Sequence, residues 1–158
     1  MFLADYAVVD PAGKINAIGG GLTAVGFNPG TGMSASFALF VQVGVPPALY
    51  GSQSAIEILL QDAGGELVEL PGPAPGLPQQ PVRVGQAVRF DEPQFPQPVS
   101  VPARFLQARV QWVLGFTSGL PLMPSQAYSW RVKIDDESND EWIERFVVLG
   151  PAPGPVIG

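Results

Sequence analysis

The chain has 158 residues and a net charge of −6, and 46% of its residues are apolar while only 14% are charged. Because about 25% charged residues is usual, the surface must be poor in charge. Cysteine and histidine are both absent, which excludes disulfides, thiolate nucleophiles, the usual catalytic triads and metals held by those residues. No basic stripe exists either, so we expect no nucleic-acid binding.

Eighteen prolines and nineteen glycines disfavour long helices and favour strands joined by many turns. We expect one domain over residues 1–149, followed by a Pro/Gly-rich tail over residues 150–158. No basic region followed by an apolar run precedes the first strand, so we expect no secretion signal and a location in the cytoplasm or in a virion. The longest uncharged apolar segment, Met33–Tyr50, is interrupted by two prolines, which predicts no membrane span.

Two apolar segments open the chain, and they are predicted to pair as a hairpin. The segments are Phe2–Val9 and Lys14–Gly20, and Asp10–Gly13 between them fits a type I turn with proline second and glycine last. Gly19–Gly21 then predicts a sharp bend or a close backbone approach. A phosphate-binding loop is disfavoured because the Lys and Ser/Thr of a Walker motif do not follow.

Alternating apolar residues predict the later strands. Phe37–Val45 alternates most regularly and ends at two prolines, whereas Phe27–Ser34 before it has the composition of a loop. A turn at Asp62–Gly65 separates two of the remaining segments. These further strands are predicted at Ser54–Gln61, Glu66–Leu70, Val82–Phe90, Ala127–Ile134 and Trp142–Leu149.

The segment Arg104–Phe116 is compatible with a helix or a strand, and its period of two favours a strand. Eight or nine strands with short turns, and no alternation of strands with helices, predict an all-β chain. The expected architecture is a single-domain, antiparallel two-sheet β-sandwich of immunoglobulin-like or jelly-roll-like type.

The opening ADYAVVDPAGKINAIGGG (Ala4–Gly21), together with Phe37–Val45, Ile56–Gly65 and Tyr128–Asp135, resembles a family of uncharacterised bacterial and phage-encoded proteins. That family is classed only as a domain of unknown function. The resemblance implies a β-sandwich without an assigned activity, and it supplies no catalytic residues to carry over. The proline-rich segments Pro71–Pro81 and Asp91–Pro98 and the tail depart from it.

Acidic residues gather between the last two predicted strands. Calcium, which prefers carboxylate oxygens, is the one candidate cofactor, and its candidate ligands are Asp135, Asp136 and Asp140 with Asp91 from another loop. A solvated acidic turn is the alternative that we favour. A carboxylate enzyme would need two such acids held in a cleft, one of them with a raised pKa, so we expect no catalysis.

Long uncharged runs, such as Ile15–Ile56, predict a weakly polar surface of the kind that contacts other proteins. We also expect Val156 and Ile157 in the tail to dock on a neighbour. The expected function is a non-catalytic structural or interaction protein, such as a decoration-type component of a phage virion. Its expected partner is another protein or a second copy. The alternative is a module that binds glycan or calcium, although core packing is expected for at least two of Trp112, Trp130 and Trp142.

Overall fold

The computed structural model describes residues 1–72, 76–94, 102 and 105–150. In these residues the regular elements are strands and short 3-10 turns, among them η1 (Pro47–Leu49) and η3 (Asp140–Trp142), so the prediction of an all-β chain is confirmed. None of the helical segments described has the length and apolar character that a membrane crossing requires. The tail residues Val156 and Ile157 lie outside the described residues.

One sheet contains three antiparallel strands in the order β1–β7–β12. They are β1 (Phe2–Ala4), β7 (Phe37–Val45) and β12 (Ala108–Phe116). The prediction for β7 is confirmed at both ends, because Pro46 and Pro47 stop the strand and start η1. The ambiguous segment before Phe116 is a strand from Ala108 onward, while Arg104 lies outside the described residues.

The second large sheet has five strands in the order β11–β8–β13–β14–β4. All its neighbours are antiparallel except β14 and β4, which run parallel. Its strands are β11 (Arg83–Arg89), β8 (Gln53–Asp62), β13 (Gln126–Ile134), β14 (Ile143–Val148) and β4 (Ala24–Val25). The predicted strands over Ser54–Gln61 and Ala127–Ile134 are therefore confirmed to within one residue.

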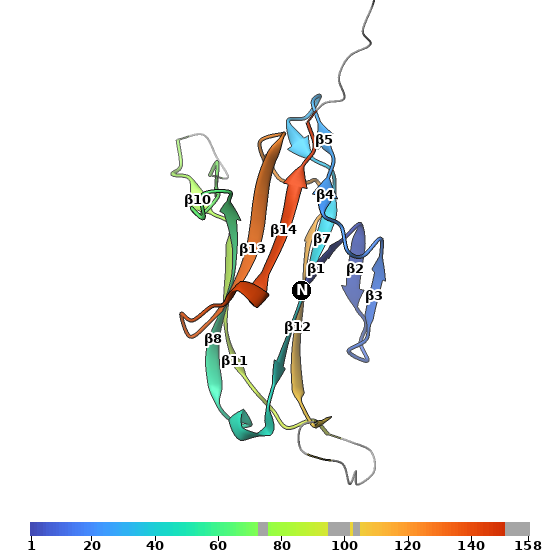
Figure 1. The fold of residues 1–158 in the computed structure, drawn as a ribbon, viewed down its shortest axis with the longest axis vertical. Coiled ribbons are helices and arrows are strands. Elements are labelled where there is room, and N and C mark those ends of the chain that lie inside the picture. Colours follow the sequence, from blue (N-terminus) through green and yellow to red (C-terminus); the bar gives the residue numbers. More distant parts are fainter. Residues whose placement is uncertain (73–75, 95–101, 103–104, 151–158) are drawn as a thin grey trace, which may run out of the picture.

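Side chains from both large sheets meet in one apolar core, which lies between the strands seen in Figure 1. The ring of Phe37 from β7 lies 5.9 Å from that of Phe146 from β14. Phe116 from β12 stacks on Trp130 from β13 at a centroid distance of 5.4 Å. The apolar alternation of the predicted strands therefore corresponds to the faces that the core buries.

Three small hairpins complete the described fold, and they correct two predictions. The segment Phe2–Val9 is two strands rather than one, because β1 pairs with β7 and the chain then leaves that sheet at Asp5. Phe27–Ser34 is not only a loop, since its ends pair around a turn in which Gly32 N donates to Asn28 O at 2.9 Å. The hairpins are β2 (Tyr6–Val9) with β3 (Ile15–Ile18), β5 (Phe27–Asn28) with β6 (Met33–Ser34), and β9 (Glu69–Leu70) with β10 (Gln80–Pro81).

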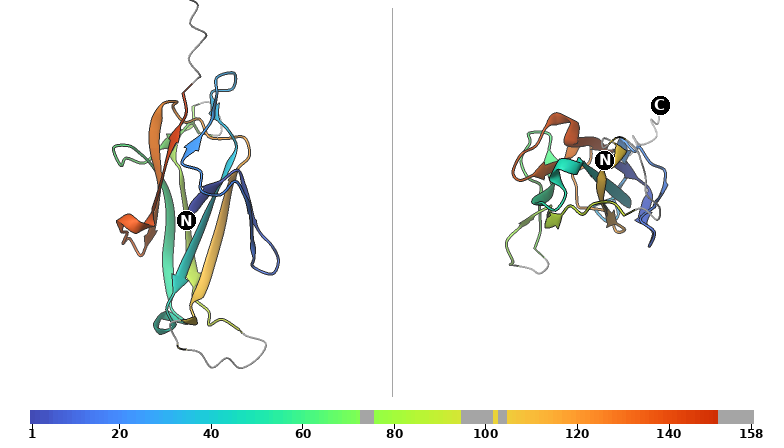
Figure 2. Two further views of the ribbon diagram at one scale, coloured as in Figure 1. Left: turned by 45° about the vertical axis from the view of Figure 1, so that its right-hand side comes forward. Right: turned by 90° about the horizontal axis from the view of Figure 1, so that it is seen from below.

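The β2–β3 hairpin projects from the side of the molecule in Figures 1 and 2. Its turn is the predicted one, with Gly13 N donating to Asp10 O at 2.9 Å. The buried Ala7 packs with Ala4 and Ala38 against the first sheet, while the opposite side of the hairpin faces solvent. The bend after β3 is also as predicted, because Gly19 and Gly21 have left-handed φ values of 64° and 87°. Gly19 is needed for space as well, since a Cβ added there would lie 2.0 Å from Asp5 Oδ2.

Candidate functional site

The acidic segment between β13 and η3 is a folded turn that is hydrogen-bonded to β8. Asp135 and Asp136 both have left-handed backbone conformations, with φ of 49° and 66°. Asp135 N donates to Ala55 O at 2.9 Å, and Asp135 Oδ1 accepts from Ala55 N at 2.8 Å. One carboxylate of the predicted calcium set is therefore engaged with the backbone at the start of β8.

The next residues of this turn position η3. Ser138 Oγ donates to Val132 O at 2.7 Å, which ties the turn back to β13. Asn139 Oδ1 accepts from Glu141 N at 2.8 Å and so caps η3. These bonds hold Glu141 and Trp142 at the edge of the core.

The four predicted calcium ligands do not form a cluster. Asp91 lies in an exposed ion pair with Arg89, at 3.4 Å between Oδ1 and Nε. In the part of the chain that the structure describes, no three acidic side chains approach closely enough to hold a metal ion. Calcium binding therefore stays a prediction, because the structure does not bring the side chains of its candidate ligands together. These ligands are Asp135, Asp136, Asp140 and Asp91.

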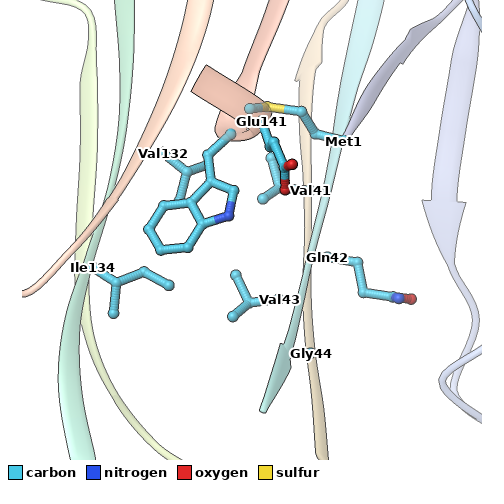
Figure 3. A pocket seen from close by; sticks show the side chains of 9 residues that line it. Met1, Val41, Gln42, Val43, Gly44, Val132, Ile134 and Glu141 are labelled. Carbon is cyan, nitrogen blue, oxygen red and sulfur yellow. The ribbon is translucent and has the colours of Figure 1, made fainter. Parts of the chain in front are cut away.

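A cavity of about 150 Å³ lies beside η3, and we call it the Trp142 pocket. Its apolar wall comes from two strands of different sheets, with Val41 and Val43 on β7 and Val132 and Ile134 on β13. Trp142 also lines the pocket, and Figure 3 shows the labelled side chains of Val43 and Ile134 that border it. Glu141 and Gln42 supply polar atoms to its lining, so this is a small, mostly apolar cavity.

Glu144 on β14 lies on the same side of its strand as the buried Phe146 and Val148. Burial raises the pKa of the Glu144 carboxyl above its ordinary value, and the positive α-amino group of Met1 partly offsets this effect. Because the pKa is raised in the folded state, the ionised carboxylate destabilises the fold at neutral pH. This cost disappears as the pH falls through the folded-state pKa.

We therefore expect Glu144→Gln to raise the free energy of unfolding at about pH 7 by less than about 1 kcal/mol. Urea unfolding followed by circular dichroism at several pH values measures this difference. The gain over the wild type should shrink as the pH is lowered through the range where the carboxyl protonates. A gain that grew on acidification would contradict the direction of the pKa change.

A wider groove of about 610 Å³ opens on the other side of the core, and we call it the Trp130 groove. Val82 and Val84 beside β8 form one wall, and Leu114 and Phe116 of β12 form the other. Trp130 contributes to its lining and is fully buried, and its Nε1 has no hydrogen-bond partner. Binding sites for other molecules are commonly grooves of this kind, with mostly apolar walls.

The other two tryptophans are half-buried and pack against the same core as Trp130, as the sequence predicted. Trp112 Nε1 donates to Gln86 Oε1 at 3.2 Å, which links β12 to β11 across the opening between the sheets. In the described residues β12 pairs only with β7, and β11 pairs only with β8. The Trp130 groove is therefore flanked by two open strand edges, a feature that sequence reasoning missed because strand order was unknown.

No protein-family model, curated protein or solved structure matches this chain. The resemblance of its opening motif to uncharacterised bacterial and phage-encoded proteins consequently remains a prediction from the sequence. Function has to be argued from the surfaces described above.

Proposed function

We propose that this protein is a non-catalytic structural protein that works by protein contact, as a subunit or accessory component of a larger assembly. The observation that carries this proposal is the exposed side of the β2–β3 hairpin. Tyr6 and Ile18 lie opposite each other across its two strands and are 55% and 68% exposed, and Val8 follows on the same side. Exposed apolar side chains grouped on a projecting hairpin are typical of a contact surface.

The scaffold that presents this hairpin is, in our proposal, a two-sheet β-sandwich of immunoglobulin-like or jelly-roll-like type. Its support is the single core shared by the two large sheets, with Phe37 against Phe146 and Phe116 against Trp130. A separate small cluster would hold the hairpin on this scaffold, because Ala7 of β2 packs with Ala4 and Ala38 of the first sheet.

The most specific form of the proposal is a decoration-type component of a phage virion. This form is supported by the sequence resemblance of Ala4–Gly21 to phage-encoded proteins and by the low charge of the chain. Neither β2 nor β3 contains a charged residue, so these two strands could be covered by another protein without burying an unpaired charge of their own.

Photo-crosslinking tests whether the hairpin contacts another protein. A photoreactive phenylalanine analogue in place of Tyr6 or Ile18 should give a discrete adduct of higher mass when the protein is irradiated in its native host. The same analogue in place of Glu137 is the control, because that residue is also exposed but lies in the acidic turn. Mass spectrometry of the adduct identifies the second protein.

Equal crosslinking from Glu137 and from the hairpin would indicate random collisions and would contradict the proposal. Absence of any adduct from Tyr6 and Ile18 would also contradict it. Circular dichroism first confirms that each variant is folded. We expect an intact fold, because the side chains of Tyr6 and Ile18 are exposed.

A further inference from the structure

The outer edge of β12 is a long strand edge that, in the described residues, has no backbone-paired strand beside it, although the Trp112 side chain reaches Gln86 of β11. The strand has nine residues, all paired on one side with β7. In the described residues no backbone hydrogen bond is made on its other side by Arg109, Gln111, Val113 or Gly115. A strand of this length with one free edge is a template for adding another strand.

The directions of the backbone groups in this sheet follow from β1. Leu3 O accepts from Gly21 N and Leu22 N, so the backbone of Leu3 points away from β7. Successive residues of an antiparallel strand point alternately to its two sides. Since Leu3 lies opposite Leu39, the backbone of Leu39 points toward β12.

The same alternation extends to the edge of β12. Leu39 lies opposite Leu114, so the backbone groups of Leu114 and of every second residue from it are used by β7. The residues between them therefore present their N–H and C=O groups to the free edge. These residues are Arg109, Gln111, Val113 and Gly115.

This edge lacks the features that usually prevent strand addition. Natural edge strands carry prolines, bulges or several charged side chains, particularly lysine. β12 contains no proline, and Arg109 is its one charged residue. In a protein with a net charge of −6, such an edge is where two copies can approach with little repulsion.

The edge is also complementary to itself. In a two-fold arrangement centred on Trp112, Arg109 of one copy lies opposite Gly115 of the other, and Gln111 lies opposite Val113. Every residue that presents backbone groups then meets another that does so, which is the condition for hydrogen-bonded pairs in an antiparallel ladder. No charged side chain faces another charged side chain across the pairing.

We propose that the outer edge of β12 is a self-association site at which a second copy of this chain adds its own β12 in antiparallel register. The two three-stranded sheets then become one continuous sheet, and Val110 of each copy lies opposite Leu114 at the mouth of the other's Trp130 groove. The inference rests on the proposed function and deepens it, because it identifies one partner and the surface that the partner uses.

Gly115→Pro tests the pairing directly. Its N–H points to the free edge, so proline removes a donor from the proposed interface without removing a bond to β7. We expect wild-type protein to sediment at twice its chain mass of 16.7 kDa and the variant to have a dissociation constant about tenfold to a hundredfold higher. Gly115→Ala is the matched control, since an added Cβ there meets no atom within 4 Å.

Mixed disulfides test the register, and the absence of native cysteine makes them simple to interpret. Arg109→Cys and Gly115→Cys proteins, mixed under mild oxidation, should form a covalent dimer, because opposite residues of a hydrogen-bonded pair lie about 5.5 Å apart. Neither protein alone should do so, since equivalent residues would then be six positions out of register.

Three results would overturn the self-pairing. They are a monomer at all concentrations up to about millimolar, a dimer whose affinity is unchanged by Gly115→Pro, and equal disulfide yields from single and mixed proteins. A monomer could still give the adducts from Tyr6 and Ile18, so the proposed function would survive that failure. If the protein were monomeric and Gly115→Pro abolished the photo-crosslinks from Tyr6 and Ile18, the outer edge of β12 would instead pair with a strand of a different protein.

Discussion

Trp130→Ala should lower the free energy of unfolding by about 3–5 kcal/mol, among the largest losses expected from a single side chain in this protein. Trp130 is fully buried and stacks on Phe116. Alanine would leave a cavity between β13 and β12 that close-packed neighbours cannot fill. Urea unfolding followed by circular dichroism measures the loss, because the substitution also removes a fluorescent reporter. Trp112→Ala, at a half-buried position, should cost less.

Trp130→Phe separates the packing of this side chain from its polar atom. Phenylalanine keeps an aromatic ring against Phe116 and removes the buried Nε1, which has no hydrogen-bond partner. An unpaired buried donor costs about 1–3 kcal/mol, so its removal should offset much of the lost volume. The variant should therefore lie closer to wild type than to Trp130→Ala. Equal losses for the two variants would indicate that Nε1 has an acceptor in the folded protein.

The strands were predictable where large apolar residues recur at every second position, even in β7, where the residues between them are also buried near its start. Phe37, Leu39 and Val41 occupy alternate positions and face one core, so a period of two in the sequence locates β7. The same pattern favoured a strand for β12 over a helix. Local turns were also predictable, because the side chain of Asp62 accepts from Gly64 N at 2.8 Å within its own turn.

Strand order and the candidate surfaces were not predictable, because they depend on contacts between distant parts of the chain. Nothing in Phe2–Ala4 indicates that it pairs with β7 rather than continuing into the hairpin. Likewise, the bond between Asp135 and Ala55 joins residues 80 positions apart. The open edge of β12 exists only because this strand lies last in its sheet. A composition-based prediction cannot show which strand that will be.

Gly119→Ala should destabilise the fold by at least about 3 kcal/mol, for a reason unrelated to apolar burial. Gly119 has a φ of 73° in the turn after β12, where a side chain is strained. An added Cβ would also lie 2.0 Å from the carbonyl oxygen of Ser34. Ser34 cannot easily move away, because its N donates to Leu120 O and its Oγ accepts from Leu120 N, at 2.8 and 2.9 Å.

Gly32→Ala is the matched control for the cost of the backbone conformation alone. Gly32 has a φ of 68°, close to that of Gly119, but a Cβ added there meets no atom within 4 Å. Its replacement should cost about 1–2 kcal/mol, the usual penalty of the left-handed region. The difference between the two variants in urea unfolding then measures the contact with Ser34. If the two losses were equal, the turn after β12 could not lie against Ser34, and the docking of β6 on Leu120 would be wrong.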